Sequence, residues 1–143
     1  MKAKGYLFVR YADDFSIYCK GKRRAQEAGN RVFLYLKNKL KLPINKEKSG
    51  IRRPTGFTLL GYGFEAGYKK GEYVLVAAEE SWKKLKEHLK EITRKTTSKS
   101  ITERIAKINQ IQRGWLNYFR AGNISTKLGK IDSWLRNRLR YCI

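Results

Sequence analysis

The spacing of apolar residues changes near residue 79, and this change limits what the chain can fold into. Upstream, short runs such as Tyr6 to Val9 and Glu72 to Val76 are rich in aromatic and β-branched residues, which is typical of strands. Downstream, apolar residues recur every three or four positions, which is typical of amphipathic helices. The sequence therefore predicts an α+β fold, with a strand-rich domain at residues 1–78 and a helical domain at residues 79–143.

Three helices are expected in the second domain. Ser100, with Glu103 three residues later, has the sequence of a capping box that begins the second helix, and Gly122 is the expected end of that helix. Inside it, Gly114 costs about 1 kcal/mol relative to alanine, so we expect another helix or an RNA to approach closely there. Three amphipathic helices joined by short loops are expected to pack as a bundle. Their apolar stripes are Trp82, Leu85, Leu89 and Ile92; Ile101, Ile105, Ile108, Ile111, Trp115 and Phe119; and Leu128, Ile131, Leu135 and Leu139.

Two hairpins and one helix are expected in the first domain. Residues 6–9 and 15–19 are predicted strands joined by a tight turn at Asp13-Asp14, because aspartate tolerates the backbone conformation of such turns. A second hairpin is expected to pair residues 57–64 with residues 72–76. Pro43 ends the helix between them, since the residue before a proline avoids the α region. The apolar face of that helix consists of Ala25, Ala28, Val32, Leu36 and Leu40.

A large excess of positive charge indicates a polyanionic partner. The chain has 33 Lys and Arg against 12 Asp and Glu, a net charge of +21 and a pI ≈ 10.2. Basic residues are interleaved with aromatic ones, so nucleic acid is the first candidate and an anionic membrane a weaker one. No apolar run approaches the length of a membrane span or resembles a signal-peptide core. Cys19 and Cys142 have no motif spacing and are interpreted as reduced thiols of a cytoplasmic protein, and His88 as a surface residue.

Asp13 and Asp14 are adjacent carboxylates in a strongly basic chain. Because like charges repel at close range, we expect a cation beside them. Mg²⁺ takes oxygen ligands and is commonly held by one or two carboxylates together with substrate phosphates. These two residues are therefore candidate magnesium ligands for a phosphoryl transfer. The alternative is an ordinary acidic hairpin turn that binds no metal.

Four sequence elements resemble those of group II intron reverse transcriptases and occur in the family's order. Three of them belong to the palm: a Tyr-x-Asp-Asp hairpin, an Asn-x-x-Lys element and a Phe-Leu-Gly element. The fourth is similar to the maturase-specific thumb region. In this chain they are Tyr11-Ala12-Asp13-Asp14, Asn45 with Lys48, Leu60-Gly61-Tyr62, and the Arg-Gly-Trp-x-x-Tyr-Phe run of residues 113–119 with Lys130 to Arg136 after it.

The resemblance implies a partial palm followed by a three-helix thumb. It implies that Asp13 and Asp14 bind catalytic Mg²⁺ in the complete enzyme, and that Lys48 is a third catalytic residue, near the incoming nucleotide, where it neutralises pyrophosphate charge. On spacing alone, an ordinary exposed surface lysine is at least as good an explanation of Lys48. The third metal-binding aspartate of that family comes from an earlier palm strand, and no residue of this sequence supplies it. We therefore expect the chain alone not to polymerise DNA, and we expect the upstream fingers and palm part of the same protein to be a partner.

The remaining candidate residues are expected to contact nucleic acid, although the signal of Leu60-Gly61-Tyr62 is weak by itself. They are Tyr11, Asn45, Gly61, Tyr62, Arg94, Lys95, Arg113, Asn117, Arg120, Arg136 and Arg138. The predicted function is part of RNA-directed DNA polymerisation and intron splicing, with intron RNA and an RNA/DNA primer-template as partners. The alternatives are a non-catalytic RNA-binding maturase module or gene remnant and, more weakly, a general basic nucleic-acid binder.

Overall fold

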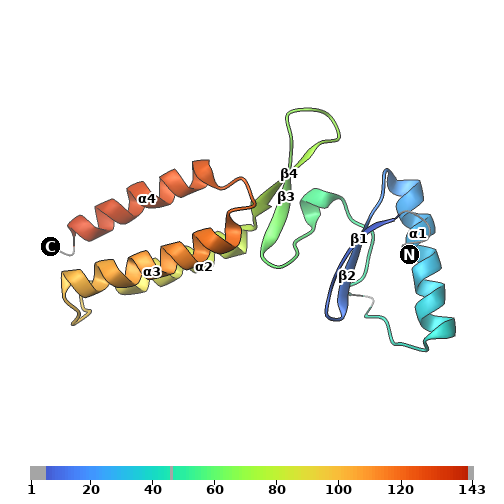
Figure 1. Cartoon of the computed structure of the whole chain (residues 1–143), viewed down its shortest axis with the longest axis horizontal. Coiled ribbons are helices and arrows are strands. Elements are labelled where there is room, and N and C mark those ends of the chain that lie inside the picture. The colour runs from blue at the N-terminus through green and yellow to red at the C-terminus, as the bar shows by residue number, and fades with distance from the viewer. Residues whose placement is uncertain (1–5, 46, 142–143) are drawn as a thin grey trace. The chain divides into compact units, whose positions relative to one another are not determined.

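Two antiparallel hairpins and four α-helices make up the computed structural model, which describes residues 6–45 and 47–141 (Figure 1). This content agrees with the predicted α+β class. The chain divides into two units, residues 1–52 and residues 53–143. The prediction for Cys142 falls outside the described residues.

The first unit holds one hairpin and one helix. β1 (Leu7–Tyr11) pairs with β2 (Asp14–Tyr18), and α1 (Lys22–Leu34) follows. The helix continues through a π-helical segment, η2 (Tyr35–Lys39), and stops before Pro43 as predicted. Ala28 is buried on the inner face of α1, which the apolar spacing predicted.

The turn of this hairpin lies one residue earlier than the sequence predicted. Tyr11 pairs with Asp14, so the two turn residues are Ala12 and Asp13, and Asp14 begins β2. Ala12 takes the left-handed conformation that the turn needs, with φ 50, and its carbonyl accepts a hydrogen bond from Arg10 Nε at 3.0 Å. Cys19 lies directly after β2 and not inside the strand, because its carbonyl accepts the Gly21 N–H as the chain turns into α1.

The second unit begins with a 3-10 turn, η3 (Pro54–Gly56), and the predicted second hairpin. β3 (Tyr62–Ala66) pairs with β4 (Tyr73–Ala77). β3 starts five residues later than the predicted Phe57, because Leu60 and Gly61 have φ 53 and φ 78 and form a tight turn. Two hydrogen bonds of 2.9 Å between the backbones of Leu59 and Tyr62 close that turn.

Three helices follow and share one core with the hairpin. They are α2 (Glu79–Ile92), α3 (Ile101–Phe119) and α4 (Ser125–Arg140). The predicted capping box is present, since the Glu103 N–H donates to Ser100 Oγ at 3.3 Å and the Ser100 N–H donates to Glu103 Oε2 at 2.9 Å. α3 ends just before the predicted Gly122. The buried residues of the core are Ala77, Trp82, Leu85, Leu89, Ile108, Phe119 and Leu135.

The predicted inner face of α3 is wrong in its first turns. Ile101 and Ile105 are 40% and 45% exposed, whereas Arg104 between them is 6% exposed. The loop between α2 and α3 covers this end of the helix with backbone carbonyl groups, which a guanidinium can satisfy and an isoleucine cannot.

Candidate nucleic-acid interface

The exposed sides of α2, α3 and α4 and their loops carry most of the cations of the second unit. Residues 81–143 contain 16 Lys or Arg and only four Asp or Glu. Because the apolar stripes face the core, 13 of these cations are exposed. We call this set the helical basic surface. It consists of Lys83, Lys84, Lys86, Lys90, Arg94, Lys95, Lys99, Lys107, Arg113, Arg120, Lys130, Arg136 and Arg140.

The loop between α2 and α3 is fixed by Arg104. The Arg104 guanidinium donates to the carbonyl oxygens of Lys99 at 2.9 Å, of Arg94 at 3.2 Å and of Thr97 at 2.5 Å. Arg94 and Lys95, two predicted nucleic-acid contacts, are exposed on this loop. Sequence reasoning missed Arg104, although a charged residue four positions before Ile108 in an apolar stripe was the available signal.

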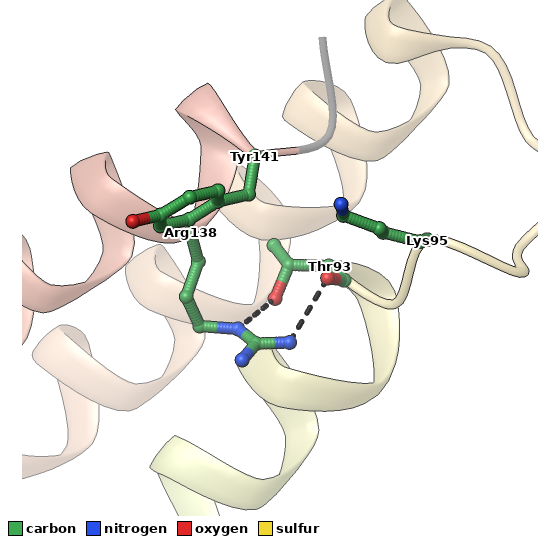
Figure 2. Close-up of a pocket in the computed structure, with 4 residues that line it drawn as sticks. All are labelled: Thr93, Lys95, Arg138 and Tyr141. Carbon is green, nitrogen blue, oxygen red and sulfur yellow. Dashed lines mark hydrogen bonds between the residues drawn. The ribbon is translucent and has the colours of Figure 1, made fainter.

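Arg138 is also used inside the protein. Its Nε donates to Thr93 Oγ1 at 2.7 Å and its Nη2 donates to the Thr93 carbonyl at 3.0 Å, as Figure 2 shows. Arg138 and Lys86 also lie over the Trp134 ring, 5.4 and 5.0 Å from its centroid. These contacts join α4 to the C-terminal end of α2, where a cation is favourable because of the helix dipole. That Arg138 contacts nucleic acid remains a prediction.

Three predicted contact residues lie on one side of α3. Arg113, Asn117 and Arg120 are separated by four and three positions, and all are exposed. Arg136 on α4 is exposed as well, and it forms an ion pair of 2.6 Å with Asp132. Because an exposed ion pair contributes little, it leaves Arg136 able to exchange Asp132 for a phosphate.

A groove of about 480 Å³ runs between α2 and α3. Leu85, Ile111 and Trp115 are among its apolar lining residues, and Lys84 and Lys107 are among its basic ones. Gly114 also lines the groove, and within residues 6–45 and 47–141 no atom outside its chain neighbours and the adjacent backbone of α3 lies within 4 Å of where its Cβ would be. The predicted close approach of another helix at Gly114 is therefore absent from the described part of the chain, and the approach of an RNA remains a prediction.

Gly61 and Tyr62, predicted to lie near a primer, are tied into the core of the second unit. A Cβ on Gly61 would lie 2.9 Å from Ser81 Oγ and 3.1 Å from the Phe119 ring. The Tyr62 hydroxyl donates to the Tyr118 carbonyl, and the Tyr118 hydroxyl donates back to the Leu60 carbonyl at 2.9 Å. These residues therefore fix the hairpin against α3, and a primer contact by them remains a prediction.

The acidic pair and the Asn-x-x-Lys element are both in the first unit. Asp13, Asp14 and Tyr11 are exposed, as are Asn45 and Lys48. Asn45 Oδ1 accepts the backbone N–H groups of Glu47 at 3.0 Å and of Lys48 at 3.2 Å, so Asn45 shapes the loop that presents Lys48. Within the described ranges no hydrogen bond or ion pair joins Lys48 to either aspartate.

The residues present fit a magnesium site only in part. Two neighbouring carboxylates are a common protein contribution to a Mg²⁺ site that also uses phosphate oxygens. The described residues hold no group of three or more His, Cys, Asp or Glu that could bind a metal by itself. A magnesium ion at Asp13 and Asp14 would therefore take its other ligands from a substrate or from another protein segment.

Residues 82–143 match the family model of the group II intron, maturase-specific domain. The matched segment contains nearly all of α2, together with α3, α4 and the helical basic surface. It includes the Arg113 to Phe119 run that carried the thumb resemblance, and it supports the predicted relation to group II intron maturases. The match does not extend to residues 1–81, so the palm resemblance remains a prediction. A comparison with curated proteins gives no match.

The helices do not have the composition of membrane spans. Among residues 6–45 and 47–141, none of them is both long enough and apolar enough to cross a bilayer.

Proposed function

We propose that this chain binds group II intron RNA through the helical basic surface and assists splicing of the intron. The observation that carries the proposal is the coincidence of the maturase-specific match with the most basic part of the fold. Thirteen exposed cations on a helical scaffold provide the electrostatic term that dominates affinity for a phosphate backbone.

The fixed loop between α2 and α3 supports a defined RNA contact and not only diffuse attraction. Arg104 restrains the backbone that presents Arg94 and Lys95, so these side chains lose less conformational entropy on binding than they would on a mobile loop. Arg113, Asn117 and Arg120 add two cations and an amide on one side of α3. Asn117 supplies both donors and acceptors, which a base edge can use.

We further propose that residues 1–78 are the C-terminal part of a reverse-transcriptase palm and residues 79–143 its thumb. In the complete enzyme, Asp13 and Asp14 would hold Mg²⁺ for RNA-directed DNA polymerisation, and a primer-template would lie against the thumb. Apolar side chains of the first hairpin support a partner there, since Leu7, Val9 and Tyr11 are 75%, 43% and 59% exposed. A two-stranded hairpin is marginally stable alone, so we propose that the upstream fingers and palm part covers it.

Binding to RNA tests the first proposal. The full chain is titrated with a group II intron RNA and with an unrelated RNA duplex at several salt concentrations. We expect tighter binding of the intron RNA, and a logarithm of affinity that falls linearly with the logarithm of salt by roughly 0.7 to 0.9 per phosphate contact. Equal affinity for both RNAs would instead identify a general basic binder, and an affinity independent of salt would contradict the electrostatic argument.

Charge variants locate the surface. Neutralising Arg113 and Arg120 to glutamine is expected to weaken binding and reduce the salt slope by about 1.4 to 1.8, without unfolding the chain, because both side chains are exposed. Replacing Arg24 and Arg31 together by glutamine is the matched control, since both are exposed helical arginines of the first unit. An equal loss of affinity in the control would refute a binding surface confined to the second unit.

Metal and polymerase assays test the second proposal. We expect no primer extension by the chain alone with Mg²⁺, and extension when an upstream fragment is added. Extension by the isolated chain that is lost in Asp13→Asn would overturn the expectation of inactivity. If replacing Asp13 and Asp14 by Asn changes neither Mg²⁺ binding nor reconstituted extension, the chain is instead a non-catalytic RNA-binding module.

A further inference from the structure

The tip of the β3–β4 hairpin presents a tyrosine that contacts nothing in the described part of the protein. Tyr68 has a relative exposure of 108%, the highest of the exposed large apolar side chains of the described residues. Lys69 and Lys70 follow it directly and are exposed. Figure 1 shows this loop, beyond the ends of β3 and β4, standing clear of α2, α3 and α4.

The loop has a defined backbone. The Gly67 N–H donates to the Glu72 carbonyl at 2.9 Å, and the Glu72 N–H donates to the Lys69 carbonyl at 3.0 Å. Gly71 has a φ of 88, and a Cβ on Gly67 would lie 2.9 Å from Glu72 Cβ, so both glycines are needed for the loop to close. Below it, the strands pair from Ala66 with Tyr73 down to Tyr62 with Ala77. Tyr68 is therefore held at a fixed place on a hairpin that is itself packed on the core.

Full exposure of an aromatic ring beside two cations indicates a ligand with a flat apolar face and negative charge. An unpaired nucleotide has both, since a base stacks on an aromatic ring while its flanking phosphates attract lysines. An anionic membrane or an acidic protein would also attract the lysines. The maturase-specific match of the same unit favours RNA over both.

We propose that Tyr68 stacks on an unpaired base of bound RNA and that Lys69 and Lys70 neutralise the adjoining phosphates. This inference rests on the proposed RNA-binding function and adds a contact that recognises single-stranded RNA. It lies at the hairpin tip, outside the matched residues 82–143.

Stacking and charge neutralisation have different signatures in the test. The full chain is titrated with a single-stranded RNA of 12 nucleotides containing 2-aminopurine, and with an RNA duplex of 12 base pairs. Tyr68→Ala is expected to weaken binding of the single strand about 5- to 100-fold with an unchanged salt slope, and to abolish quenching of 2-aminopurine. Tyr68→Phe should bind like the wild type, because the ring is retained. Replacing Lys69 and Lys70 by Gln should instead lower the salt slope by about 1.4.

Controls separate this contact from general effects. Tyr35→Ala is the matched control, since Tyr35 is an exposed tyrosine with Lys37 and Lys39 close by in the sequence. It should not change the affinity, and the fluorescence-detected unfolding of Tyr68→Ala should match that of the wild type because the side chain touches nothing.

Each alternative outcome has a clear meaning. If the wild type binds intron RNA but Tyr68→Ala binds the single strand equally well, this inference is wrong and the proposed function stands. If the wild type does not bind RNA at all, the proposed function fails and this inference fails with it. If Tyr68→Ala no longer binds anionic phosphatidylserine vesicles that the wild type binds, and its RNA binding is unchanged, the inference is overturned in favour of a membrane contact.

Discussion

Replacing Arg104 by methionine tests whether a buried cation holds the loop between α2 and α3. Three backbone carbonyl groups accept hydrogen bonds from its guanidinium. A hydrogen bond to a charged group contributes about 1.5–3 kcal/mol, although these carbonyls belong to loop residues and can partly rebind water. Methionine keeps much of the apolar stem, so little packing is lost. We therefore expect the free energy of unfolding of the second unit to fall by about 2–4 kcal/mol.

Tryptophan fluorescence isolates this unit in the intact chain. All three tryptophans, Trp82, Trp115 and Trp134, belong to residues 53–143, so their emission during urea unfolding reports the second unit alone. Arg113→Met is the matched control, since Arg113 is an exposed arginine of the same helix. It should change the unfolding free energy by less than about 0.5 kcal/mol.

The functional consequence of Arg104→Met is a weaker RNA complex under conditions where the second unit is still folded. A loop that is no longer fixed must be ordered on binding, which reduces the contribution of Arg94 and Lys95. If the free energy of unfolding of Arg104→Met lies within about 0.5 kcal/mol of the wild-type value, the guanidinium does not hold the loop and this reasoning is refuted.

Three further substitutions probe the second unit by urea unfolding. Gly61→Ala should lower the free energy of unfolding by about 1–3 kcal/mol, because the backbone has φ 78 and a Cβ would lie 2.9 Å from Ser81 Oγ. Gly71→Ala should lower it by less, because Gly71 has φ 88 but open space around it. Thr93→Val should cost about 1–3 kcal/mol, since it removes the hydroxyl that accepts from Arg138 Nε; equal stability would show that the pair is dispensable. The pKa of Glu103 is lowered from 4.5, first by the hydrogen bond from the backbone N–H of Ser100 and then by that of the Ser100 hydroxyl. The contribution of Glu103 to the free energy of unfolding is therefore complete above pH 4.5, and it is lost as the pH falls through the lower pKa of the folded state. Glu103→Gln should remove that part of the pH dependence, and an unchanged acid profile would contradict the capping interaction.

Much of the fold could be predicted because short-range patterns encode it. The stripe through Trp82, Leu85 and Leu89 predicted α2, and Ser100 with Glu103 predicted the start of α3, since both patterns depend on neighbours within a few residues. The two hairpins were likewise marked by strand-forming residues around turns. The register of the first hairpin was predicted one residue too late, because several backbone conformations suit the segment Ala12 to Asp14 and strand pairing selects among them.

The candidate site was less predictable, because side chains with the same sequence signal have different surroundings. Arg113 and Arg138 are both arginines near helix stripes, yet Arg113 is exposed and Arg138 binds Thr93 on another helix. Tyr62 had the signal of a primer contact, but its hydroxyl binds the backbone of α3. Tyr68 carried no motif, and its full exposure is visible only once the hairpin is folded.

The sequence by itself determined the positions of the helices and hairpins, the excess of positive charge and the similarity of residues 82–143 to the maturase-specific domain. Tertiary structure alone decided which cations are exposed, and that Arg104 is buried on the inner face of α3 where Ile101 was expected. It also decided that Gly61 packs so closely against Phe119 that a Cβ would not fit there. The physical reason is that helix and strand formation depends on residues close in sequence. Burial and hydrogen bonding of a long side chain depend instead on which distant backbone groups meet it in the folded unit.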